Sequence, residues 1–383
     1  MKRNSVEISP DKTYLTLRWA DGNQARFHAI WLRDNGLDGD TRSPLNGQRL
    51  ITLGDIPHDT RILEASVRET GDLQVLFGPE NKQIAFPEDW LRRHVYDREP
   101  ASEADPGPIS FWNAGLQDRY PRSSWELIRH APAELGRWLA GVRAYGFAVV
   151  GGVPCQSGAV CEVAELFGYV RETNYGRWFD VRAEVNPSNL AYTNLGLQAH
   201  TDNPYRDPVP TLQLLCCLEN AVDGGDSVVV DGFNAARRLR SEDPGAFDLL
   251  ARYPASFEYT GARGVHLRAD KPMIELAADG GISTIRFNNR STAPLVNIPF
   301  DEMQAYYRAY RLFADIIDDQ TMQVSFRLSP GELFIVDNRR VLHARKPFSG
   351  TGQRWLQGCY ADVDGLLSTL SVIEQQQKTG VMA

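Results

Sequence analysis

The chain is short of cysteine, histidine and long apolar runs. Its five cysteines form no Cys-x-x-Cys pair and lie in apolar segments, so they predict buried, reduced thiols and argue against a disulfide framework. No run of about eighteen apolar residues occurs, which argues against a membrane-spanning helix. The first residues, MKRNSVEISPDKTY, contain no apolar segment of the signal-peptide kind. We therefore expect a cytoplasmic protein.

Positive charge is also in short supply. Lysine and arginine total 41 against 49 acidic residues, and the net charge of −8 disfavours a general nucleic-acid binder, which needs a basic surface. Most of the positive charge is arginine, whose planar guanidinium suits bidentate binding of carboxylates and phosphonates. We expect a small molecule as partner, and neither nucleic acid nor membrane.

The length and a change of pattern near residue 98 predict two domains. Residues 1–97 contain short strand patterns, with hairpins formed by TYLTLRWADG with NQARFHAIWL and by DLQVLFG with KQIAFP, and they predict a small β-rich N-terminal domain. Residues 98–110 are polar and rich in proline, alanine and glutamate, as in a linker. Residues 111–383 form the larger domain in this interpretation.

The larger domain mixes helices with many short strands. Helical spacing covers residues 123–146, 160–170, 233–253 and 299–319. Strand patterns dominate after residue 187, from LAYTNLG (190–196) to WLQGCYAD (355–362). Regularly spaced short strands are typical of a sandwich or jelly roll, here with helices packed outside. The expected fold class is therefore α+β with a jelly-roll core.

A metal-ligand pattern begins in the stretch LQAHTDNPY, residues 197–205. Residues two apart in a strand face the same side, so we expect His200 and Asp202 to present an imidazole and a carboxylate together. A metal needs a third ligand, and His343, in the run FIVDNRRVLHARKPF, supplies it. Two histidines and one carboxylate on one face of an octahedron leave three positions open, which suits non-haem Fe(II) and oxygen activation.

Two further features suit a 2-oxo acid bound at such a metal. Arg354 follows His343 by 11 positions on the next strand pattern, where a guanidinium can form a two-point salt bridge with a distal carboxylate. The run GGDS, residues 224–227, lies on a neighbouring strand pattern. Its glycines allow close approach, and the Ser227 hydroxyl can donate to the same carboxylate.

The order of these motifs resembles the Fe(II)/2-oxoglutarate oxygenases of the taurine dioxygenase type. More narrowly, RETNYGRWFDVR, NLAYTN, HTDNPYRDP, LQLLCCLENAVDGGDSVVVDGFNAA, DNRRVLHAR and QGCYAD resemble the γ-butyrobetaine hydroxylase and trimethyllysine hydroxylase family, and WLRDN fits that family's leading domain. The resemblance covers nearly the whole chain. The family includes a branch that hydroxylates 2-(trimethylammonio)ethylphosphonate, and the chain resembles that branch as well.

The resemblance implies a double-stranded β-helix core with iron held by His200, Asp202 and His343. It implies that 2-oxoglutarate chelates the iron and pairs with Arg354, aided by Ser227, and that decarboxylation to succinate and CO2 drives hydroxylation of a substrate. Members of the family are commonly homodimers, so a homodimer is expected here.

The family's substrates carry a trimethylammonium group, which has no N–H to donate and is held by aromatic faces. The candidate residues for this box are Tyr175, Trp178, Phe179, Tyr192 and Tyr360. Three of them, Tyr175, Tyr192 and Tyr360, match the family's cage tyrosines by resemblance, whereas Phe179 stands where the human butyrobetaine enzyme has a tryptophan.

The opposite end of such a substrate is anionic. Asn189 resembles the asparagine that binds the butyrobetaine carboxylate, and Asn288 or Asn289 resembles its partner. Arg290 follows this pair, where the human butyrobetaine enzyme has a small residue. An extra guanidinium suits a phosphonate, with its greater charge and three oxygens, better than a carboxylate. The alternative is that Arg290 points to solvent.

The N-terminal region departs from the family in its metal chemistry. Many relatives follow WLRDN with a Cys-x-Cys-x-x-Cys run and complete a zinc site with a later histidine, whereas this chain reads WLRDNGLDGDTRSP and keeps only His94. One imidazole does not make a structural zinc site, so none is expected.

The sequence therefore predicts an Fe(II)/2-oxoglutarate hydroxylase acting on a short trimethylammonium zwitterion. The phosphonate, hydroxylated at the carbon next to phosphorus, is placed first because of Arg290 and the missing thiolates, followed by γ-butyrobetaine and then trimethyllysine. Two alternatives stay open: a non-catalytic betaine-binding or scaffold protein, and a metal-dependent isomerase or hydrolase on a cupin-like barrel.

Overall fold

The computed structural model of the chain describes residues 3–97, 109–182, 194–261, 263–349 and 352–379. The chain divides into two compact units, Met1–Ala101 and Ser102–Ala383. The linker expected at 98–110 falls almost entirely outside the described residues, as does most of the strand expected at 190–196. Within the described ranges no helix has the length and apolar character needed to cross a membrane.

The N-terminal unit contains two antiparallel three-stranded sheets, β1-β2-β3 and β4-β5-β6. Their elements are β1 (Ser5–Ile8), β2 (Tyr14–Arg18), β3 (Gln24–His28), α1 (Ala29–Asp34), β4 (Arg61–Val67), β5 (Leu73–Gly78), β6 (Lys82–Phe86) and α2 (Glu88–Arg93). Alternate strand residues, such as Leu15, Leu17 and Phe27, are fully buried in one core because successive side chains point to opposite faces. Both expected hairpins are present, since β2 pairs with β3 and β5 with β6.

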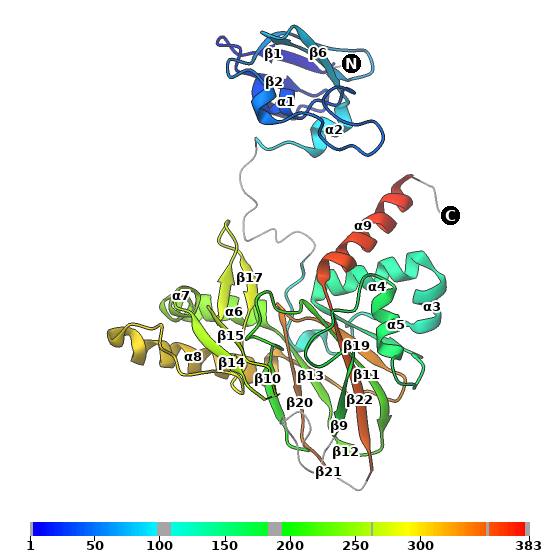
Figure 1. Cartoon of the computed structure of the whole chain (residues 1–383), viewed down its shortest axis with the longest axis vertical. Helices are drawn as coiled ribbons and strands as arrows, with labels where there is room; N and C mark the ends of the chain where they lie inside the picture. Colours follow the sequence, from blue (N-terminus) through cyan, green and yellow to red (C-terminus); the bar gives the residue numbers. More distant parts are fainter. Residues whose placement is uncertain (1–2, 98–108, 183–193, 262, 350–351, 380–383) are drawn as a thin grey trace. The chain divides into compact units, whose positions relative to one another are not determined.

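Two facing sheets form the centre of the second unit (Figure 1). The six-stranded sheet consists, in spatial order, of β7 (Arg122–Ser124), β8 (Phe147–Gly151), β19 (Leu333–Asp337), β11 (Leu212–Asn220), β22 (Arg354–Ala361) and β9 (Phe179–Arg182). The four-stranded sheet consists of β10 (Leu197–His200), β20 (Val341–Arg345), β13 (Ser227–Asp231) and β18 (Gln323–Phe326). Side chains of both sheets, among them Leu215, Val229 and Phe334, pack into one core. This is the jelly-roll arrangement that the strand spacing predicts.

Helices cover the outer sides of the two sheets (Figure 1). Those beside the six-stranded sheet are α3 (Trp125–His130), α4 (Pro132–Tyr145), α5 (Ala159–Glu165) and α9 (Val363–Thr379), and those beside the four-stranded sheet are α6 (Gly232–Glu242), α7 (Pro244–Arg252) and α8 (Met303–Asp318). Shorter strands pair as β12 (Asp223–Gly224) with β21 (Phe348–Ser349), β14 (Ala255–Tyr259) with β15 (Leu267–Lys271), and β16 (Ile274–Leu276) with β17 (Ile282–Ile285). Leu214 faces the helices while its neighbour Leu215 faces the interior, as strand alternation requires.

Proline divides two helices that the spacing predicts as continuous. The helix expected at 123–146 breaks between α3 and α4, where Ala131 is extended (φ −121°, ψ 102°) because the residue before a proline avoids helical geometry. The helix expected at 233–253 breaks in the same way before Pro244. The two ends of the divided helix are capped: Ser124 accepts from the Leu127 N–H, and Gly146 is left-handed at φ 75°.

Candidate active site

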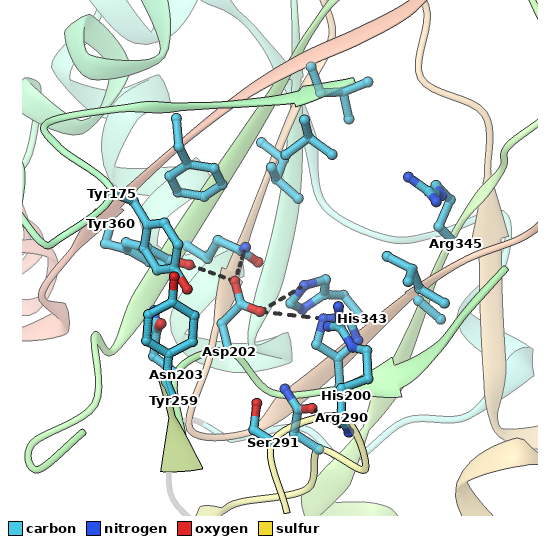
Figure 2. Close-up of a pocket in the computed structure, with 18 of the residues that line it drawn as sticks. Tyr175, His200, Asp202, Asn203, Tyr259, Arg290, Ser291, His343, Arg345 and Tyr360 are labelled. Atoms are coloured by element: carbon cyan, nitrogen blue, oxygen red, sulfur yellow. Dashed lines mark hydrogen bonds and ion pairs between the residues drawn. The ribbon is translucent and has the colours of Figure 1, made fainter. Parts of the chain in front are cut away.

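A cavity of ≈ 470 Å³ opens between the two sheets of the second unit. One wall comes from the six-stranded sheet, including Gln213 and Tyr360, and the other from the four-stranded sheet, including Ser227 and His343. Figure 2 shows charged groups and tyrosines converging on this space. The packing of the two sheets therefore brings together polar residues that the sequence analysis proposed for binding the metal and the cosubstrate.

His200 and His343 lie opposite each other on neighbouring strands. They are register partners in the antiparallel pair β10–β20, and their ring centroids are 4.4 Å apart. Both side chains are buried. His200 donates from Nδ1 to the Gln198 carbonyl oxygen at 2.7 Å, which leaves the Nε2 lone pair free to bind a cation.

Asp202 lies beside the two histidines, but the strand alternation that the sequence suggests does not position it. β10 ends at His200, so Asp202 lies in the turn beyond the strand, and the two-residue strand period does not place it. Its backbone is held instead by Asn338: the Asp202 N–H donates to Asn338 Oδ1 at 2.7 Å, and Asn338 Nδ2 donates to the Asp202 carbonyl oxygen at 2.9 Å. Asn203 follows at φ 53°, a left-handed turn that asparagine tolerates.

The three side chains form a compact donor set. Asp202 Oδ1 lies 3.4 Å from His200 Nε2 and 3.8 Å from His343 Nε2. Candidate ligand atoms of the three residues all lie within 4.8 Å of one another. A single ion placed among them contacts two imidazole nitrogens and one carboxylate oxygen, the set typical of non-haem Fe(II) oxygenases.

The protonation states of the three groups suit metal binding. Burial and the neighbouring His200 lower the pKa of His343 to about 3, and burial together with the charge of Arg290 lowers the pKa of His200. Burial raises the pKa of Asp202, but the hydrogen bond from His200 and the charge of His343, both present when these imidazoles are protonated in acid, outweigh burial and hold that pKa below its usual value. At neutral pH the site therefore offers two neutral imidazoles and one carboxylate, the forms in which these ligands bind.

A cationic region adjoins this donor set. Arg354 is buried and donates from Nη2 to the Gly225 carbonyl oxygen at 3.2 Å, while its Nε has no hydrogen-bond partner in the described part of the chain. Gly225 has φ 73°, and a Cβ there would lie 3.0 Å from Arg354 Nε, so only glycine lets the guanidinium sit this close. Ser227 and Arg345 are register partners that also line the cavity.

Arg345 was not identified from the sequence. It stands two residues after His343 in β20 and therefore faces the same side, which is the signal that could have found it. Burial and the charge of Arg354 lower its pKa to about 10, so it is still a cation at neutral pH. A pair of buried guanidiniums beside the donor set favours a dianionic ligand.

Tyrosines and Phe179 form an aromatic wall on another side of the cavity. Tyr175, Phe179 and Tyr360, all candidates from the sequence, line it, with Phe179 and Tyr360 at a centroid distance of 5.2 Å. Tyr205 and Tyr259 were missed; they stack at 5.2 Å with an interplanar angle of 26°, and the Tyr205 and Tyr175 hydroxyls are hydrogen-bonded at 2.9 Å. Tyr205 lies in the quoted stretch 197–205, three residues after Asp202, which was its available signal.

Several candidate residues stand elsewhere or are already engaged. Trp178 is 40% exposed and does not line the cavity. Asn289 does not line it either, because its amide donates to Gln198 and its oxygen accepts from the Tyr310 hydroxyl. The candidates Asn189 and Tyr192 lie outside the described residues.

Asn288 and Arg290 do line the cavity, on the loop after β17. Asn288 is buried and spans two backbone groups, donating to the Thr201 carbonyl oxygen at 3.0 Å and accepting from the Arg290 N–H at 3.1 Å. Its amide therefore shapes the loop that carries Arg290 rather than standing open to a ligand.

Comparison with known proteins agrees with this geometry. The sequence model of the family described as "Taurine catabolism dioxygenase TauD, TfdA family" matches residues 119–360, and that described as "Gamma-butyrobetaine hydroxylase-like, N-terminal" matches residues 6–94. Gamma-butyrobetaine dioxygenase of Pseudomonas sp. (strain AK-1) is 35% identical over 94% of this chain and 94% of its own length. The human protein of that name is 27% identical over 96% of both chains. Trimethyllysine dioxygenase of Meyerozyma guilliermondii is 28% identical over 97% of this chain and 96% of its own.

These relatives are dioxygenases, which argues against the non-catalytic and the isomerase or hydrolase alternatives. The first family match spans most of the second unit and includes His200, Asp202, His343 and Arg354. The chain therefore belongs to the γ-butyrobetaine and trimethyllysine hydroxylase family of Fe(II)- and 2-oxoglutarate-dependent dioxygenases.

Proposed function

We propose that the chain hydroxylates γ-butyrobetaine, with Fe(II) held by His200, Asp202 and His343 and 2-oxoglutarate held by Arg354. The observation that carries the proposal is that the three-residue donor set, the buried guanidiniums and the aromatic wall line one cavity. A cosubstrate dianion and a quaternary ammonium substrate can thus meet at one metal.

The residues divide the work of the reaction. When bound at this site, Fe(II) and 2-oxoglutarate would supply the dioxygen activation that hydroxylation of a C–H bond needs. Arg354, Ser227 and Arg345 form the polar end that receives the cosubstrate's distal carboxylate. Leu215 and Leu356 line the cavity beside them and exclude water, which strengthens these ionic contacts.

The aromatic wall provides the site for the trimethylammonium head. A quaternary ammonium gains about 0.5 to 2 kcal/mol from each aromatic face, depending on how well it is desolvated. Tyr175, Phe179, Tyr205, Tyr259 and Tyr360 supply faces within one cavity. Such a head held against the wall places the short carbon chain toward the donor set, since Tyr360 touches both.

The relatives change the order of the candidate substrates. The sequence expectation placed the phosphonate first, but the similar proteins reported above are γ-butyrobetaine and trimethyllysine dioxygenases, and the one at 35% identity is a γ-butyrobetaine enzyme. γ-Butyrobetaine therefore takes first place. Homodimer formation, a cytoplasmic location and the lack of a structural zinc site stay predictions.

One observation keeps the phosphonate as a second candidate. Arg290 lines the cavity, close enough to lower the pKa of both His200 and His343 through its charge. A guanidinium at this place suits the three oxygens of a phosphonate.

Substrate comparison tests the proposal. The iron-loaded enzyme is given γ-butyrobetaine, the phosphonate or trimethyllysine, and both succinate and the hydroxylated product are measured. The highest kcat/KM for γ-butyrobetaine supports the proposal, and a higher value for the phosphonate overturns it. Arg290→Gln is the companion variant: a selective loss of phosphonate turnover assigns Arg290 to that anion.

A further inference from the structure

The two oxygens of Asp202 have different neighbours. Oδ1 faces both histidines, whereas Oδ2 accepts hydrogen bonds from the Tyr360 hydroxyl at 2.8 Å and from Gln213 Nε2. Figure 2 shows the carboxylate lying between the histidines and Tyr360. A carboxylate accepts only, so these two donors engage Oδ2 and leave Oδ1 directed at the donor set.

Gln213 and Tyr360 act from one place in the fold. They are register partners across β11 and β22, neighbouring strands of the six-stranded sheet, and the two residues are 3% and 4% exposed. Asp202, in contrast, follows β10 of the opposite sheet. The cross-strand pair therefore reaches across the cavity to a residue that lies in a turn.

This contact compensates for the position of Asp202 beyond its strand. A residue beyond the end of a strand has no ladder hydrogen bonds to fix its backbone, and backbone contacts alone do not fix the torsions of a carboxylate side chain, so other groups must hold both. Asn338 fixes the backbone of Asp202, and Gln213 with Tyr360 fixes the carboxylate. Partners of a metal ligand that orient it in this way typically change metal affinity roughly 10- to 100-fold when removed.

We infer that Tyr360 and Gln213 are positioning residues for the metal: they hold Asp202 as a ligand through Oδ1 alone and so keep the remaining coordination positions open. The inference rests on the proposed ligand set. It gives Tyr360 a second role, because its ring also packs against Phe179 in the aromatic wall. The hydroxyl serves the metal ligand and the ring serves the wall.

Metal titration of the full chain tests the inference without relying on turnover. Metal-free wild type, Tyr360→Phe and Gln213→Met are titrated with Co(II), and affinity is measured by calorimetry and the visible absorption spectrum. Each variant should bind Co(II) roughly 10- to 100-fold more weakly, with an altered spectrum, because Asp202 is free to turn. Tyr306→Phe is the matched control: it removes another buried tyrosine hydroxyl, one outside the cavity and without a hydrogen-bond partner in the described residues, and should bind like wild type.

Agreement between the two variants separates a role at the metal from a role in the aromatic wall. Gln213 contributes no ring to that wall, so a similar fall in Co(II) affinity in Gln213→Met and Tyr360→Phe assigns the loss to the hydrogen bonds with Asp202. Wild-type Co(II) affinity and spectrum in both Tyr360→Phe and Gln213→Met would overturn the inference.

His200→Ala distinguishes this failure from failure of the ligand set. If His200→Ala loses Co(II) while Tyr360→Phe and Gln213→Met bind normally, the ligand set stands and only the positioning role is wrong. If His200→Ala binds Co(II) as tightly as wild type, the ligand set and the positioning role are both wrong. Thermal unfolding of each variant shows whether the chain is folded. Tyr360→Phe deletes only one oxygen atom and is therefore the variant whose Co(II) affinity decides whether the positioning role is right.

Discussion

His200 and His343 face each other across β10 and β20 as register partners, although 143 positions separate them in the chain. Their Nε2 atoms both approach Asp202 Oδ1, at 3.4 and 3.8 Å. Strand pairing therefore sets the distance between two of the proposed ligands, while the third depends on side-chain contacts from the opposite sheet. This difference leads to predictions for each part of the site.

Removal of a proposed ligand should abolish turnover and leave the fold nearly intact. His200→Ala or Asp202→Ala deletes one of the three proposed protein ligands, so succinate formation should fall below detection, while circular dichroism should show wild-type secondary structure. His58→Ala, at an exposed histidine of the N-terminal unit, is the control and should keep full activity. Loss of folding in the ligand variants would mean that these residues serve structure instead.

Arg354→Ala should impair cosubstrate binding more than substrate binding. Hydrogen bonds to a charged group contribute about 1.5 to 3 kcal/mol, so the KM for 2-oxoglutarate should rise roughly 10- to 100-fold. The KM for the trimethylammonium substrate should change much less. Steady-state kinetics with each reactant varied in turn gives both values, and an equal rise in the two would contradict the assignment.

Tyr259→Leu should weaken recognition of the quaternary ammonium. Loss of one aromatic face should raise the substrate KM by roughly 2- to 30-fold. Trp178→Leu is the matched control because Trp178 is exposed outside the cavity, and its KM should equal that of wild type. If Trp178→Leu raised the KM and Tyr259→Leu did not, the aromatic wall would be wrongly placed.

The metal-free protein should lose stability in acid because of His343. Its pKa is lowered from 6.5 to about 3 in the folded chain, so between these values the unfolded chain binds a proton that the folded chain does not. The free energy of unfolding should therefore fall as the pH drops from about 6.5 toward 3. Urea unfolding at several pH values measures this, and His343→Gln should show a smaller dependence. If the free energy of unfolding of His343→Gln depended on pH as strongly as that of wild type, the neutral, buried state of His343 would be contradicted.

The sequence predicts this site through residue types whose combination suits a metal. His200, Asp202 and His343 could be proposed because two imidazoles and a carboxylate suit Fe(II), and because Arg354 and the run GGDS accompany them in the order of a known family. The reason given for Asp202 was wrong, however, since strand alternation does not extend past the end of β10. Asn338, which holds its backbone, lies in a turn after β19 and carries no local signal of that role.

The aromatic wall shows where sequence reasoning stops. Tyr259 comes from β14, in a separate two-stranded sheet, and only the packing of that sheet brings it to the cavity. Trp178 has the right chemistry and a neighbour in the wall, yet its side chain is exposed. Residue type predicts that a side chain can bind a cation, but the direction in which it points depends on contacts far away in the chain.

The helices, too, could be predicted only in part from the sequence. Their existence could be read from apolar spacing, whereas Pro132 and Pro244 mark breaks that the spacing alone does not show. Helix α9 was missed, because its stretch follows the last strand motif and has no feature tied to the site.

A crystal structure with Fe(II) and 2-oxoglutarate, recorded at the iron absorption edge, tests the central claim most directly. The account predicts one anomalous peak bonded to His200 Nε2, Asp202 Oδ1 and His343 Nε2, with the cosubstrate's distal carboxylate on Arg354. Iron bound elsewhere, or His343 turned away from the ion, would contradict it.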